Sequence, residues 1–136
     1  MSIHKIRSAL VQTFSGGVGL SGNYENSNDH DPRADTPWFE FFLIPNRPSV
    51  VTLGDEGLNE HTGIVQINLN YPLHEGSGAV LQKADEVSNL FKAGSRHTYQ
   101  GQTVSIISCG LDGSGQIVNG FYQAILTIQY RAQTPR

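Results

Sequence analysis

The hydrophobic pattern is clearest between residues 62 and 94, where a strand-like stretch is followed by a helix-like one. From residue 64 to residue 71, apolar side chains alternate with polar ones, and this two-residue period predicts a half-buried strand. Pro72 ends the strand, and the glycines and serine that follow it predict a turn. The apolar positions of an amphipathic helix come next, spaced by three or four residues: Val80, Ala84, Val87 and Phe91. We expect this helix and the strand to pack face to face.

Upstream, the same helical spacing predicts a first helix that ends near residue 16, with these apolar positions: Ile3, Ile6, Leu10 and Phe14. Residues 16–36 then show no period, being rich in glycine at first and in Asn and Asp later. A loop of that length is unusual in a compact domain unless it has a function or an outside partner. We therefore expect this loop to be mobile in the isolated chain and to be ordered by a neighbour.

Residues 38–43 form a predicted strand with apolar side chains on both faces. One face should meet the core, and the other should meet a helix or another subunit. Further strands are expected at residues 50–53, 103–109 and 121–131, with a hairpin turn at 112–115 and a loose tail at 132–136. This order predicts an α+β domain whose two helices pack on one face of a largely antiparallel mixed sheet of about four to five strands.

Composition narrows the classes of protein that the chain can represent. Its 136 residues, formal net charge of -3 and pI near 5.9 suit one globular domain over residues 1–136. No cluster of Lys and Arg supplies the basic patch that binding to nucleic acid requires. No apolar run has the length of a signal peptide or a membrane span, so we expect a soluble protein made inside a cell. The single Cys109 excludes an internal disulfide and, within its apolar run, predicts a small buried side chain.

Two stretches resemble functional motifs but lack the context that the chemistry needs. Residues 17–22 match the G-x-G-x-x-G pattern of dinucleotide-binding turns, yet a predicted helix precedes them and no helix pattern follows. The acidic stretch at residues 29–35 offers metal-type ligands in a spacing that partly matches a calcium loop. Arg33 occupies a ligand position there, and neither a turn glycine nor a closing Glu is present. We expect a flexible loop and a solvated acidic loop instead.

The histidines and serines give no catalytic pattern either. His61, His74 and His97 each lie next to a turn, share no metal spacing and are expected at the surface. No G-x-S-x-G elbow is present to expose a nucleophilic serine. The sequence therefore predicts no active site, no metal and no cofactor.

A series of short motifs resembles the series found in a known family. Tyr-Glu-Asn at residues 24–26 is followed by Thr-Pro before the aromatic strand, Leu-Ile-Pro at the end of that strand and Thr-Leu-Gly at 52–54. The strand Gly-Ile-Val-Gln-Ile at 63–67, Tyr-Pro at 71–72 and the helix end Leu-Phe-Lys-Ala-Gly at 90–94 complete the series. With the first helix and the closing hairpin, nearly the whole chain is similar to the tail terminator proteins of long-tailed bacteriophages.

The resemblance implies a structural virion protein and no enzymatic activity. It implies a ring, typically a hexamer, that sits on the completed tail tube, stops tube polymerisation and presents the surface that joins the head. The implied partners are other copies of the chain, the tail tube protein and a head-completion or neck protein. The genome would only pass through the ring, which would be assembled in the bacterial host cytoplasm and reside at the head-proximal end of the tail.

Two other hypotheses stay open at this point. A head-completion or neck adaptor would keep the ring and change the partner, and a small α+β enzyme would need convergent titratable residues in a closed pocket. Candidates for assembly contacts are the strand aromatics, the acidic turn and the charged loop: Trp38, Phe39 and Phe41; Asp55 and Glu56; Asp29, Asp31 and Arg33.

Overall fold

The computed structural model describes residues 3–25, 36–74 and 76–135. Its two helices are α1 (Ile3–Gly17) and α2 (Gly78–Leu90). Its strands are β1 (Ser21–Tyr24), β2 (Trp38–Pro45), β3 (Ser49–Val50), β4 (Leu58–Pro72), β5 (Arg96–Tyr99), β6 (Gln102–Val118) and β7 (Phe121–Pro135). The two helices and the sheet make an α+β fold, which confirms the predicted class.

All seven strands join one sheet in the order β1-β2-β4-β7-β6-β5, and β3 pairs with β4 beside this path. The sheet is therefore larger than the four to five strands predicted. The extra strands β1 and β5 are four residues long, and four residues are too few to show a two-residue period. The prediction of a largely antiparallel sheet is only partly right, because β1 joins β2 in parallel.

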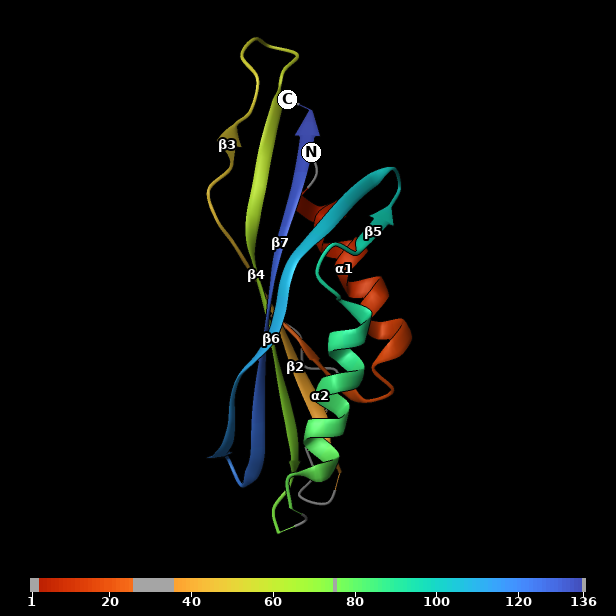
Figure 1. Ribbon diagram of the computed structural model, residues 1–136, viewed down its shortest axis with the longest axis vertical. Helices are drawn as coiled ribbons and strands as arrows, with labels where there is room; N and C mark the ends of the chain where they lie inside the picture. Colours follow the sequence, from red (N-terminus) through yellow and green to blue (C-terminus); the bar gives the residue numbers. More distant parts are fainter. Residues whose placement is uncertain (1–2, 26–35, 75, 136) are drawn as a thin grey trace.

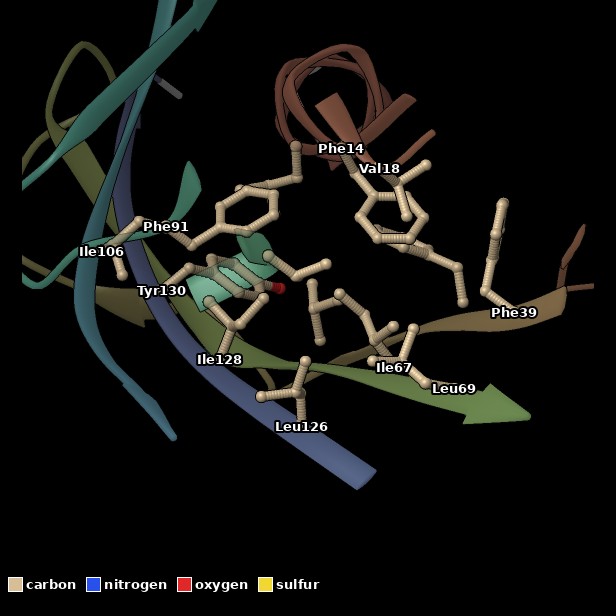
Figure 2. Close-up of a cluster of buried hydrophobic side chains, with 14 of the residues drawn as sticks. Phe14, Val18, Phe39, Ile67, Leu69, Phe91, Ile106, Leu126, Ile128 and Tyr130 are labelled. Atoms are coloured by element: carbon tan, nitrogen blue, oxygen red, sulfur yellow. The ribbon is translucent and has the colours of Figure 1, made fainter. Parts of the chain in front are cut away.

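Both helices cover the same face of the sheet, as predicted (Figure 1). Between the helices and the sheet lies one apolar core, to which every long strand contributes alternate side chains. Figure 2 shows Phe14 of α1 and Phe91 after α2 above the row formed by Ile67, Leu126 and Ile128. The predicted packing of the central strand against the amphipathic helix is thus confirmed, since Val80, Ala84 and Val87 are buried there.

One glutamate fixes the end of the short strand β1. Its carboxylate, from Glu25, accepts a hydrogen bond from Arg7 Nε of α1 and another from the Leu43 backbone N–H of β2, at 2.8 Å. Next to it, the Arg7 guanidinium lies over the Tyr24 ring, 5.8 Å from the centroid. A helix, an edge strand and its neighbour are therefore held together by one charged group and one ring.

The predicted hairpin turn at residues 112–115 is wrong. β6 continues through this stretch with register shifts after Leu111 and after Ser114, so the glycines there serve β-bulges. The turn lies at Asn119 and Gly120, whose φ angles of 50° and 81° suit a two-residue type I′ hairpin. Gln100 and Gly101 (φ 48° and 83°) connect β5 to β6 in the same way.

Two segments predicted to be irregular contain regular structure. The tail belongs to β7, in which Ala132 and Thr134 are buried against the rest of the sheet. Within the predicted loop at 16–36, α1 extends to Gly17 and β1 follows. Residues 26–35 of that loop lie outside the described residues.

Gly63 should be intolerant of any side chain, because β2 and β7 crowd its position in β4. A Cβ built there would lie 2.6 Å from the Ile44 carbonyl oxygen and 2.7 Å from the Tyr130 hydroxyl. We expect Gly63→Ala to lower the free energy of unfolding by about 1–3 kcal/mol, measured by urea denaturation. Gly110→Ala is the matched control, since nothing lies within 4 Å of a Cβ there. Equal stability of the two variants would contradict the crowding.

Candidate assembly surfaces

The described residues contain no cluster of side chains that could hold a metal ion. No group of three or more His, Cys, Asp or Glu side chains lies together within 3–25, 36–74 and 76–135. Within the same ranges, no helix combines the length and the apolar character that crossing a membrane requires. The acidic stretch with Asp29, Asp31 and Arg33 falls outside the described residues.

The stretch that matches the dinucleotide motif runs from a helix end into a strand. Gly17 ends α1, Gly19 has a φ of 66° between the elements, and Gly22 lies in β1 against Phe39. Strand residues 23 and 24 follow the motif directly, so no helix begins at these glycines with an N-terminus that could hold a phosphate.

Two of the three histidines predicted at the surface have structural contacts in the interior. His61 is buried, and its Nε2 lies 2.9 Å from the Thr134 hydroxyl. His97 joins α1 to β5: its Nδ1 lies 2.9 Å from Thr13 Oγ1 and its Nε2 lies 3.1 Å from Ser95 Oγ. The prediction of surface histidines is thus wrong for His61 and only partly right for His97, whereas His74 is exposed.

The interior position of His97 should make stability depend on pH. Burial lowers the pKa of His97 below its ordinary value of 6.5, so the folded protein holds a neutral imidazole at pH 7. Unfolding restores the ordinary pKa, and the unfolded chain binds more protons below it. Stability should therefore fall as the pH drops through about 6.5 and continue to fall until the lowered pKa of the folded state is passed.

Urea denaturation at several values between about pH 7.5 and pH 5.5 measures this effect. We expect His97→Gln to remove part of the decline in unfolding free energy, while His74→Gln serves as the exposed control. The same decline in wild type and His97→Gln would assign the pH dependence to other groups.

Cys109 is half-buried rather than fully buried, and its Sγ lies 3.8 Å from Ser88 Oγ. Burial raises the pKa of the Cys109 thiol, which keeps it protonated and weakly nucleophilic at neutral pH. The thiol therefore packs as an apolar group at the core margin, close to the sequence prediction.

The sheet face opposite the helices carries a chain of hydrogen-bonded amides. Gln123 Nε2 donates to Asn70 Oδ1 at 2.9 Å, and Asn70 Nδ2 donates to Glu40 Oε1 at 3.3 Å. Asn68 and Gln66 extend the chain along β4. Asn70 is only 1% exposed, so the network is a fixed part of this face and crosses β2, β4 and β7.

Beyond the core, residues 45–57 form a projection that we call the arm (Figure 1). Hydrogen bonds connect the arm to β4 along its length: Asn46 N–H donates to the Thr62 carbonyl, Val51 N–H donates to the Leu58 carbonyl, and Thr52 Oγ1 accepts from Leu58 N–H. Its tip is apolar and acidic at once, with Leu53 92% exposed beside the exposed Asp55 and Glu56. An apolar side chain so exposed on a fixed projection is typical of an interaction site.

The structure divides the predicted contact residues into separate groups. Phe39 and Phe41 point into the subunit's own core, where Phe14 and Tyr24 pack on them. Trp38 is buried on the other face, its ring centroid 5.7 Å from that of Phe121. Among the predicted contact residues that the structure describes, only Asp55 and Glu56 are exposed on a surface.

Sequence reasoning missed the exposed apolar residues outside the aromatic strand. Ile117, next to the β6–β7 turn, is 70% exposed, and Val50 of β3 is 61% exposed. Both residues belong to stretches with ordinary strand composition. They differ from buried strand residues only because no helix or strand covers them. The Asn-Gly sequence at residues 119 and 120 is the signal that could have predicted a hairpin turn there, with Ile117 close to the end of the hairpin.

Comparison with known proteins identifies a family to which the chain is similar. A family model described as "Phage tail terminator protein" matches residues 5–130. A solved structure whose name states no function is similar to this chain with a TM-score of 0.74 and 20% identity, over 98% of this chain and 97% of its own. At this identity the likeness shows the fold alone. A comparison with curated protein sequences finds no match.

Proposed function

This chain belongs to the phage tail terminator family and is a structural component of the virion tail, and from this premise we propose that it forms the ring that ends the tail tube. The ring, a hexamer, caps the completed tube at its head-proximal end, stops further addition of tube protein and offers the surface to which the head joins. Its partners are copies of itself, the tail tube protein and a head-completion or neck protein. Assembly takes place in the cytoplasm of the bacterial host.

The arrangement of the sheet edges carries the proposal. A closed ring requires two different, complementary patches on each subunit, one on each flank. The described sheet is open, with β1 and β3 on one side of the long β4–β7 pair and β5 on the other. Open edges with unpaired backbone groups favour association with further chains.

The two ends of the long axis also differ in chemistry. The arm ends in an acidic turn with Leu53, whereas the opposite end carries the β6–β7 turn with the apolar Ile117 (Figure 1). A terminator must match the tube on one side and differ from a tube subunit on the other, or the tube would continue to grow. Two unlike ends supply this asymmetry.

Purified protein and tail tubes from a phage that lacks it can test the cap directly. We expect negative-stain images to show one ring at a tube end, and capped tubes to stop elongating when tube protein is added. Tubes without the protein are the control and should continue to grow. Continued growth at the same rate, with no ring at either end, would contradict the proposal; binding to heads but not to tubes would favour a neck adaptor.

A further inference from the structure

The sheet splits at the end where the arm projects. β6 pairs with β7 from Val118 up to Ser105, and beyond that point it pairs with β5 instead. Figure 1 shows β6 turning away from β7 in this region. The last residues of β7, 132–135, keep their pairing with β4. A wedge-shaped opening is left between two strands of the same sheet.

This opening, which we call the hollow, has a volume of about 420 Å³. Polar groups and strand backbone line it, among them Gln102, Thr103 and Gln133. The Gln102 side chain spans it, because its Nε2 donates to the Thr103 and Gln133 carbonyls at 3.1 Å each. The carbonyl of Gln133 therefore faces into the hollow.

Two arginines make the hollow basic. Arg96 and Arg131 both pair in register with Ser105, so their side chains stand on the same face of the sheet on either side of it. Among the described residues that line the hollow, none carries a carboxylate. Glu60 lies 3.5 Å from Arg131 at the margin, while the Arg131 side chain stays 58% exposed. The hollow thus presents positive charge beside strand backbone.

Strand β3 of the arm and the hollow lie at the same level on opposite flanks of the subunit, and the arm tip continues past the Leu58 and Pro135 pair that ends the ladder (Figure 1). Val50 of the arm pairs with Asn59 of β4, which pairs with Thr134 of β7, next to the hollow residue Gln133. A line across the sheet therefore runs from β3 of the arm to the hollow through the β4–β7 pair. This is the relation that two contacting patches must have in a closed ring, where the left flank of each subunit meets the right flank of the next.

We infer that the arm of each subunit docks in the hollow of the neighbouring copy, and this inference rests on the proposed ring. Asp55 and Glu56 at the arm tip pair with Arg96 and Arg131 of the neighbour, and Leu53 is covered by the same contact. The charges are complementary, and the hydrogen bonds between the arm and β4 hold the arm tip in place before binding. The acidic pair thereby acts between subunits.

Charge reversal with rescue tests the pairing. The arm variant is Asp55→Arg with Glu56→Arg, and the hollow variant is Arg96→Glu with Arg131→Gln, which avoids a carboxylate against Glu60. Each should raise the protein concentration needed for half-maximal ring formation by about tenfold or more at low salt, because like charges meet in the contact. The protein that carries both variants should recover most of the loss. Native mass and electron microscopy of rings on tail tubes measure all four proteins.

The matched control is Asp85→Arg with Glu86→Arg, which makes the same charge change on the exposed side of α2. Circular dichroism establishes that every variant folds. Rings that form equally well in either reversed variant, or a combined variant without recovery, would overturn the arm–hollow contact and leave the terminator function standing. A wild-type protein that forms no ring even on tail tubes would overturn both.

Discussion

Phages that lack this protein are expected to fill their heads with DNA while their tails grow to irregular, excessive lengths and stay separate from the heads. The physical reason is that a tube of stacked identical rings exposes the same docking surface after each addition, so growth has no intrinsic end. A cap that matches this surface on one side and differs on the other removes it. Electron microscopy of lysates gives the tail lengths and the fraction of joined particles.

Complementation makes the result specific to the protein. Wild-type protein supplied from a plasmid should restore uniform tails, and the combined arm and hollow variant should restore them better than either variant alone. Null particles with tails of normal length that join heads would refute the terminator function. Tails of normal length beside unjoined heads would instead indicate a neck adaptor.

Replacing Phe91 with Ala is expected to lower the free energy of unfolding by about 3–5 kcal/mol, which is a large part of the stability of a domain this size. The Phe91 side chain is fully buried between α2 and the sheet, beside Tyr130 and Ile106 in Figure 2. Its ring centroid lies 5.3 Å from that of His97, so the substitution also removes an aromatic side chain that packs against His97. Urea denaturation at pH 7 measures the loss.

Leu53→Ala is the informative control for this experiment. Leu53 is an equally apolar residue in free solvent, so its truncation should change stability by less than about 0.5 kcal/mol. It should nevertheless weaken ring formation if the arm is a contact. A loss below about 1 kcal/mol for Phe91→Ala would show that the core collapses around the missing ring.

The long periodic elements could be predicted from the sequence because their apolar side chains lie on one side of the helix or strand. α1, α2 and β4 each carry an apolar stripe against a polar one, and their type and facing were predicted correctly. The turn of the β6–β7 hairpin was predicted at the wrong residues because two stretches near the end of β6 both have the composition of a turn. Asp112-Gly113-Ser114-Gly115 has turn composition but forms bulges, while Asn119-Gly120 has the positive φ angles that a tight hairpin needs.

The candidate site depended on information that no local pattern contains. Arg96, Arg131 and Glu60 belong to three strands. Arg131 and Glu60 approach each other across the β4–β7 ladder, and Arg96 reaches the other side of the hollow through its pairing with Ser105 of β6. The aromatic strand is not an interface at Phe39 and Phe41, because α1 of the same subunit covers both side chains. A strand with apolar side chains on both faces predicts that both faces are covered. The pattern does not indicate whether the same subunit or another subunit covers them.

The hydrogen-bonded ladder between β4 and β7 makes the resistance of the subunit to force depend on the direction of that force. It runs without a register shift from the Leu58 and Pro135 pair to the Pro72 and Phe121 pair, through 15 residues of each strand. At about 3.4 Å per residue, the paired strands have a length of roughly 50 Å, and we call this pair the beam. A load along the beam shears every pair at once, whereas a load across it opens the pairs singly. A subunit seated with this pair of strands parallel to the tail would therefore resist stretching most strongly along the tail axis.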